Sequence, residues 1–301
     1  MVEATPVSFR SDGLTLAGDL RIPDGHAPMP AAMFTGPFSG VKEQVTGLYA
    51  AALADRGYVT LAFDHRNFGE SQGQPRQHED ASGKGRDLLD AVSYLATRPE
   101  VDAQRIGCVG ICLGGGYALR HAAFDPRVRA LALVAGGFNS PADMRAGMGT
   151  DRYRQVLADL AAVAAETFRT GEVPYLPAVA AHGSEAAMPG DEPWAYYGTD
   201  RSASPGWVNR VTRLSIRELL TLDAMSAADF VSPTPTLIVH GTTDAYCSPE
   251  GARAVYERLA PPKDVYWLST SNHIDLYDNP DFVHPALERV GAWFDTHLRN
   301  A

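Results

Sequence analysis

A cysteine between glycines is the residue of this chain whose type and setting could do chemistry most directly. Cys112 lies in the stretch GICLGGGY, residues 110–117, after the apolar run 105–109, which predicts a buried strand, and before residues 117–124, which predict a helix. A strand, a sharp turn with small flanking residues and a helix form the nucleophile elbow G-x-S-x-G, here with cysteine in place of serine. The helix N-terminus favours a thiolate. We therefore predict that Cys112 is a nucleophile.

The alternative interpretation is a glycine-rich turn that binds phosphate, with an incidental buried cysteine. Residues 110–117 lack the Lys-Ser/Thr ending of a P-loop and the G-x-G-x-x-G spacing of a dinucleotide site. The sequence therefore favours a nucleophile over a phosphate-binding loop.

A cysteine nucleophile needs a base to keep it ionised, and that base needs an orienting carboxylate. Asp244 follows the strand predicted at 236–239, and His273 follows the last predicted strand. The three residues occur in the order nucleophile, acid, histidine, and each follows a predicted strand. We predict Cys112, Asp244 and His273 as the catalytic residues.

Each partner of Cys112 has a structural alternative. A lone histidine in a loop is usually a surface residue, so the prediction of His273 as the base depends on Cys112 and Asp244 being present as well. Asp244 could instead cap the helix near Pro249. Asp143, behind the preceding strand, is the rival acid, although an N-cap role at the start of the inserted segment suits it better.

Acyl transfer also needs two backbone N–H groups aimed at the oxygen that becomes negative. The N–H of Leu113, directly after the nucleophile, is one predicted donor. The second is expected from the loop 35–40, and because Pro37 has no N–H, we predict Phe38. The alternative is a simple Gly-Pro turn.

The elements that position these residues alternate between short apolar runs and helical patterns, which predicts a mostly parallel sheet with helices on its faces. The first two strands are expected to be antiparallel, because Asp12-Gly13 is a hairpin signal. The eight predicted strands are 6–10, 14–22, 31–35, 58–64, 105–109, 129–135, 236–239 and 265–268. The predicted helices of this core are 48–56, 85–97, 117–124, 249–259 and 282–298.

The alternation stops between residues 140 and 230, where no clear strand is expected. Residues 151–170 have apolar residues at helical spacing. Residues 207–222 predict a second helix, with Ser204 as N-cap and Pro205 at its first position. We interpret 140–230 as an inserted, mainly helical cap, and 1–139 with 231–301 as the core.

Composition excludes several function classes. The net charge of −10 over 301 residues argues against nucleic acid or an anionic membrane as a partner. No run of about 18 apolar residues exists, and the first residues lack the pattern of a signal peptide.

Three cysteines, an odd number, fit a reducing cytoplasm. No His, Asp and Cys cluster has ligand spacing, so we expect neither a metal nor another cofactor. The oligomeric state, a homodimer included, stays open.

Four segments together resemble the α/β-hydrolase superfamily, and within it the cysteine-containing relatives of dienelactone hydrolase. They are residues 35–44, 62–71, 110–117 and 272–277. The resemblance implies an α/β-hydrolase fold and a triad of Cys112, His273 and Asp244. The same group includes fungal polyketide transferases, which move an acyl chain from a carrier-protein thioester to an alcohol.

Cysteine at position 112 narrows the reaction. Attack by a thiolate forms a thioester acyl-enzyme. The free energy of this step is unfavourable when the donor is an alkyl ester or amide, and close to zero when the donor is a thioester or enol ester. We expect hydrolysis of an activated ester, lactone or thioester. The closest alternative is acyl transfer from a carrier-protein or coenzyme A thioester to an alcohol or amine. A third class, a non-catalytic binding relative, usually lacks a triad member.

Overall fold

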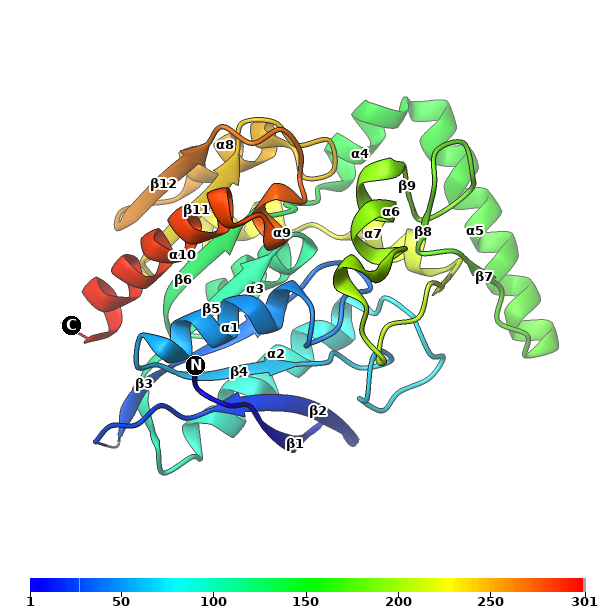
Figure 1. The fold of residues 1–301 in the computed structure, drawn as a ribbon. Coiled ribbons are helices and arrows are strands. Elements are labelled where there is room, and N and C mark those ends of the chain that lie inside the picture. Colours follow the sequence, from blue (N-terminus) through cyan, green and yellow to red (C-terminus); the bar gives the residue numbers. More distant parts are fainter. Residues whose placement is uncertain (27, 300–301) are drawn as a thin grey trace.

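One mixed sheet forms the centre of the computed structural model, which describes residues 1–26 and 28–299 (Figure 1). Within these residues, eight strands lie in the order β1-β2-β4-β3-β5-β6-β11-β12. The β1–β2 pair is antiparallel, as the sequence predicts, and so is the β2–β4 pair; the other pairs are parallel, which confirms the prediction of a mostly parallel sheet. The strands are β1 (Thr5–Ser11), β2 (Leu14–Arg21), β3 (Met29–Thr35), β4 (Val59–Phe63), β5 (Val101–Ile111), β6 (Val128–Val134), β11 (Thr236–Gly241) and β12 (Lys263–Leu268).

Turn chemistry and burial explain where the strands lie. The predicted hairpin is confirmed: Asp12 and Gly13 both have positive φ, and Ser11 faces Leu14 across a two-residue loop. Every residue of β3 and of β4 is buried. Continuous apolar runs of this kind are typical of parallel strands that are covered on both faces.

Two groups of helices cover the sheet (Figure 1). The first helix, α1 (Val45–Asp55), packs on β3, β4 and α10 (Pro280–Phe294). On the other face, α2 (Ala81–Ala96) packs on β1, β5 and α3 (Leu113–Phe124), and α8 (Pro249–Arg258) packs on β11. The apolar contacts between these layers form the core of the protein. None of the helices in the described part of the chain is long and apolar enough to cross a membrane.

Residues 140–230 add no strand to the central sheet and gather at one end of it (Figure 1). They contain α4 (Pro141–Met148), α5 (Thr150–Thr170), α6 (Asp191–Tyr197) and α7 (Ser215–Thr221). The prediction of a helix over 151–170 is confirmed by α5. The expectation of no strand was wrong, because four two-residue strands occur here: β7 (Tyr175–Leu176), β8 (Val179–Ala180), β9 (Met188–Pro189) and β10 (Val211–Thr212).

The predicted helix over 207–222 was wrong at its first half. Residues 211–212 pair with β7, so only residues 215–221 remain helical. Ser204 does not cap a helix; its hydroxyl lies 3.2 Å from a carboxylate oxygen of Glu43. Strand pairing with a distant segment therefore overrides the local helical pattern.

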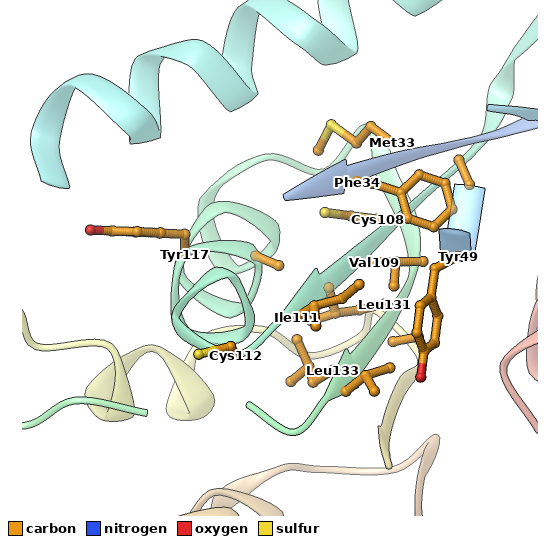
Figure 2. Packing of buried hydrophobic residues seen from close by; sticks show 14 of the residues in the cluster. Met33, Phe34, Tyr49, Cys108, Val109, Ile111, Cys112, Tyr117, Leu131 and Leu133 are labelled. Atoms are coloured by element: carbon orange, nitrogen blue, oxygen red, sulfur yellow. The ribbon is translucent and has the colours of Figure 1, made fainter. Parts of the chain in front are cut away.

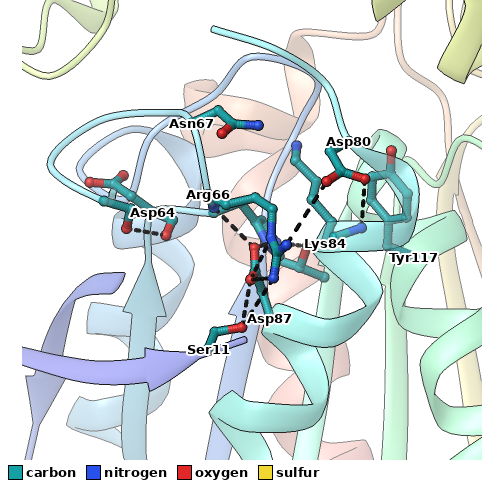
Figure 3. Close-up of polar contacts among 12 residues, drawn as sticks. Ser11, Asp64, Arg66, Asn67, Asp80, Lys84, Asp87 and Tyr117 are labelled. Atoms are coloured by element: carbon teal, nitrogen blue, oxygen red, sulfur yellow. Dashed lines mark hydrogen bonds and ion pairs between the residues drawn. The ribbon is translucent and has the colours of Figure 1, made fainter. Parts of the chain in front are cut away.

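A buried ionic network fixes the loop after β4 to α2 (Figure 3). Asp87 Oδ1 accepts hydrogen bonds from Arg66 Nη2 at 2.8 Å, from Arg66 Nε at 3.0 Å and from Ser11 Oγ at 2.8 Å. Asp87 Oδ2 lies 3.2 Å from His65 Nδ1, and His65 Nε2 lies 2.9 Å from Thr35 Oγ1 at the end of β3. Burial raises the pKa of Asp87, but its hydrogen bonds with His65 and Arg66 outweigh burial and lower it. The network holds the end of β3 in place.

A second buried pair connects α2 to α3. Lys84 Nζ lies 2.8 Å from Glu79 Oε1, and the Tyr117 hydroxyl donates to the same carboxylate at 2.7 Å. Tyr117 belongs to the first turns of α3, so this pair fixes the helix that begins after Cys112 (Figure 3).

We predict that Asp87→Ala destabilises the fold by about 3–5 kcal/mol, because it removes the closest partner of the buried Arg66 guanidinium. That guanidinium then keeps only Asp12 at 3.4 Å and Asp80 at 3.9 Å as charged partners. Chemical denaturation monitored by circular dichroism measures the free energy of unfolding. Asp90→Ala, three residues further along α2 and outside the network, is the matched control and should change it by less than about 0.5 kcal/mol. Equal losses in the two variants would contradict this account of the network.

Candidate active site

Cys112 is the single residue between the end of β5 and the start of α3 (Figure 2). Its φ of 56° and ψ of −127° lie in a region that L-residues rarely adopt. Its carbonyl oxygen accepts hydrogen bonds from the N–H groups of Gly115 at 2.8 Å and Gly137 at 2.7 Å. The strained turn predicted from the sequence is therefore present, and it places the sulfur at the N-terminus of α3.

The flanking glycines allow α3 to approach the sheet. A Cβ on Gly114 would collide with the backbone carbonyl oxygens of Thr35 and Gly36, and one on Gly110 would collide with the carbonyl of Gly114. The spacing of glycines around Cys112 is thus a packing requirement of the turn. It brings the first turn of α3 against the loop that follows β3.

His273 and Asp244 meet in the structure. His273 Nδ1 lies 2.6 Å from Asp244 Oδ2, and both side chains are buried. Asp244 Oδ1 accepts hydrogen bonds from the backbone N–H groups of Tyr246 at 2.8 Å and Cys247 at 2.7 Å. Because both oxygens of the carboxylate are held, the orientation of the imidazole is fixed.

The structural alternatives for the acid do not match this geometry. The N-cap of α8 is Ser248, whose hydroxyl accepts from the Gly251 N–H, so Asp244 does not cap that helix. Asp143 is exposed in the first turn of α4. The expectation that Asp143 is an N-cap was wrong, because Ser140 caps α4.

Tyr277 completes the surroundings of His273 and was not predicted. Its hydroxyl oxygen lies 3.0 Å from His273 Nε2. The two residues are four apart on the short helical turn around α9 (Asp275–Asp278), a spacing that places them on one face. That four-residue spacing was the signal in the sequence from which Tyr277 could have been predicted.

In the described chain, Cys112 Sγ and a ring nitrogen of His273 lie within 4.8 Å of each other.

The three cysteines have different surroundings. Cys247 Sγ lies 3.8 Å from Cys112 Sγ, and both side chains are buried. Cys108 is farther back along β5, near Met33 and Phe34 (Figure 2). Burial raises the pKa of the Cys108 thiol, so this thiol is inert.

The electrostatics of the site favour an ion pair between Cys112 and His273. A hydrogen bond with Cys247, the charge of His273 and a hydrogen bond with Tyr277 outweigh burial and lower the pKa of Cys112 well below its ordinary value. Burial opposes the charged form of His273, but Cys112 and Asp244 outweigh it and raise the pKa of His273 to about 10. Both shifts favour a thiolate and an imidazolium.

The predicted oxyanion donors lie on the elements expected of them. Leu113 is the first residue of α3, where an N–H has no partner within the helix. Phe38 is buried in the loop after β3, whose Gly40 N–H donates to the Pro37 carbonyl at 3.1 Å. Their role as donors stays a prediction.

A cavity of about 470 Å³ borders the site. Gly137 and Cys247, the neighbours of Cys112, belong to its wall. The lining also includes Met144 and Met148 of α4 and Met225. The cavity is large enough for a small acyl chain and offers it apolar side chains.

Comparison with known proteins identifies the family. A family model described as serine aminopeptidase, S33, matches residues 42–278. The uncharacterized protein PA2218 of Pseudomonas aeruginosa is 33% identical over 99% of this chain and 81% of its own length. Its crystal structure has a TM-score of 0.88 and covers 99% of this chain and 94% of the other.

Two fungal relatives have named activities. Thiohydrolase aneE of Aspergillus aculeatus is 30% identical over 88% of this chain and 84% of its own length. Polyketide transferase grgF of a Penicillium species is 30% identical over 88% of this chain and 87% of its own length. The crystal structure of GrgF has a TM-score of 0.86, at 27% identity, and covers 99% of this chain and 100% of the other.

These matches confirm the resemblance and the fold expected from the sequence. The family description names serine, whereas this chain has cysteine at the centre of its elbow. The chain belongs to the serine aminopeptidase S33 family of α/β hydrolases.

Proposed function

We propose that this protein hydrolyses an activated acyl bond of an ester, lactone or thioester through a thioester on Cys112. The observation that carries the proposal is the buried arrangement of Cys112, His273 and Asp244. The His273–Asp244 contact is 2.6 Å, and a ring nitrogen of His273 lies within 4.8 Å of the Cys112 sulfur. The relative aneE, named a thiohydrolase, supports the reaction class.

The proposed reaction has two halves. The Cys112 thiolate attacks the acyl carbon, and the N–H groups of Leu113 and Phe38 stabilise the resulting oxyanion. The C–X bond then breaks, and the His273 imidazolium gives its proton to the leaving group. In the second half, neutral His273 takes a proton from water, which attacks the thioester and releases a carboxylic acid. The Cys112 thiolate and the His273 imidazolium are restored.

Burial of the site favours a second candidate, acyl transfer to an alcohol or amine. The thioester keeps its acyl-transfer potential, so a bound acceptor can replace water where water is excluded. Cys112 and His273 are both buried, and Tyr196 and Tyr197 of α6 pack around Tyr277 beside them. The relative grgF, named a polyketide transferase, supports this candidate, with a carrier-protein or coenzyme A thioester as donor.

A non-catalytic binding role is less favoured by the same geometry. Binding relatives of an enzyme keep its fold without its reactive groups. Here Cys112, His273 and Asp244 are all present and in contact or close to it. In our proposal residues 140–230 form the cap that covers them.

We predict that alkylation of Cys112 by iodoacetamide changes little between about pH 9 and pH 6. A lowered thiol pKa keeps the thiolate populated as the pH falls, and imidazolium persists up to about pH 10. An ordinary thiol of pKa about 8.5 would lose reactivity by roughly 200-fold over that range. Mass spectrometry after timed alkylation, with a chelator in the buffer, measures the rate. His273→Ala should restore the ordinary fall, and an ordinary fall in the unchanged protein would contradict the ion pair.

We predict that acyl donors form a covalent adduct on Cys112. Intact-mass measurement after rapid quenching of reactions with N-acetylcysteamine thioesters and p-nitrophenyl esters detects it. Cys112→Ala should lose the adduct and at least about 10³-fold in kcat/KM. Cys108→Ala, a buried thiol outside the site, is the matched control and should keep both. Full turnover by Cys112→Ala would refute the mechanism.

We predict that the free acid is the main product when an alcohol acceptor is absent or present at low concentration. Chromatography of the products of one thioester donor, with increasing amounts of primary alcohols, measures the partition. Ester formation that exceeds acid formation at millimolar alcohol would favour the transferase. Rates of donor loss that do not depend on the alcohol would favour the hydrolase.

A further inference from the structure

A second thiol makes the site more than a triad. Cys112 Sγ, Cys247 Sγ and a ring nitrogen of His273 all lie within 4.8 Å of one another, and all three residues are buried. Two sulfurs and an imidazole nitrogen are the ligands that zinc and other thiophilic metals prefer. In the proposed acyl chemistry Cys247 only contacts the Cys112 thiol and forms no bond to the substrate.

The distance between the sulfurs matches a tetrahedral metal. Zinc–sulfur bonds of about 2.3 Å at the tetrahedral angle separate two bound sulfurs by about 3.8 Å. The observed distance between Cys112 Sγ and Cys247 Sγ is 3.8 Å. The two cysteines therefore need little movement to share one metal ion.

The imidazole is also held as a metal ligand is held. Histidines that bind zinc commonly donate their other ring N–H to a carboxylate, which fixes the ring and raises its basicity. His273 Nδ1 lies 2.6 Å from Asp244 Oδ2, and backbone N–H groups hold the second oxygen of Asp244. The Nε2 atom, which contacts the Tyr277 hydroxyl at 3.0 Å, is the ring nitrogen that does not face Asp244, and a bound metal ion would take the place of that contact.

Charge balance supports the same set. Two thiolates neutralise a divalent cation, so the ion and its two sulfur ligands together carry no net charge, and the Asp244 carboxylate keeps the backbone N–H partners it already has. A second group of close potential ligands in the described chain differs on this point. Its three carboxylates, Glu43, Asp64 and Glu70, already surround the Lys42 ammonium at 2.5, 3.5 and 2.6 Å. The Lys42 ammonium therefore occupies the position that a metal ion would take among these carboxylates.

We propose that Cys112, Cys247 and His273 bind one thiophilic divalent metal ion, with Zn²⁺ as the physiological candidate, and that the bound ion blocks acyl transfer. Three protein ligands leave a fourth position for water. The block rests on the proposed function, because the ion occupies both the nucleophile and the base. The binding itself rests only on the three ligands.

Cobalt binding tests the ligand set without any acyl substrate. Protein freed of metal with a chelator and kept reduced is titrated with Co²⁺, whose visible absorption reports tetrahedral geometry and whose near-ultraviolet charge-transfer bands report thiolate ligands. We expect one ion per chain with both signatures. Zn²⁺, added with a competing chromophoric chelator, should displace it.

Two variants separate this site from adventitious binding. Cys247→Ser keeps the size of the side chain and a hydrogen-bond donor, and should weaken Zn²⁺ binding by about 100-fold or more. Cys108→Ser, which removes a thiol outside the site, should bind as the unchanged protein does. Zn²⁺ should raise the Tm of the unchanged protein and of Cys108→Ser, but not that of Cys247→Ser. Equal affinity in all three proteins would overturn the site.

The effect on chemistry is measured separately. Zn²⁺ should prevent the acyl adduct on Cys112, and a chelator should restore it. Cys247→Ser, compared with its own rate without Zn²⁺, should keep forming the adduct at Zn²⁺ concentrations that block the unchanged protein. Zn²⁺ that binds and leaves the adduct unchanged, or increases it, would overturn the block. A protein that binds Co²⁺ but never forms an adduct would instead refute the proposed acyl function and leave the metal site intact.

Discussion

The backbone of Cys112 has a positive φ, and the whole site depends on that one strained residue. Such a conformation costs about 1–3 kcal/mol and persists only where its surroundings hold it. Two N–H groups bind the Cys112 carbonyl, and glycines let α3 pack directly on the ends of neighbouring strands. The sulfur is therefore placed by packing of the scaffold, and the loops bring the other groups to it.

The geometry of the site also depends on buried charges that are paired with one another. The Asp87 network holds the end of β3, from which the loop that contains Phe38 begins. A similar balance operates in the site, where the shifts in pKa favour opposite charges on Cys112 and His273 despite their burial. In our proposal this pairing keeps a thiolate populated away from water. The same exclusion of water would let the proposed thioester react with an acceptor.

The sequence predicted the parts of the site that follow strands and missed the parts that depend on packing between distant segments. Cys112, Asp244 and His273 each follow a parallel strand of one sheet, and the carboxyl ends of such strands lie at the same edge. Cys247 approaches Cys112 only because β11 and β5 lie on either side of β6. The helix predicted at 207–222 failed for a related reason, since residues 211–212 found a strand partner in β7.

Residues 140–230 contact the surroundings of His273 through α6. Tyr197 of α6 packs edge-on against Tyr277 and is itself stacked on Trp207. The Ile274 N–H, next to His273, donates to Glu192 of α6 at 3.0 Å. Any shift of α6 would therefore move the hydroxyl that faces His273 Nε2. In our proposal the triad decides which acyl donors react, whereas this inserted segment decides whether water or an alcohol reaches the thioester. Close relatives can then share one triad and differ in acceptor.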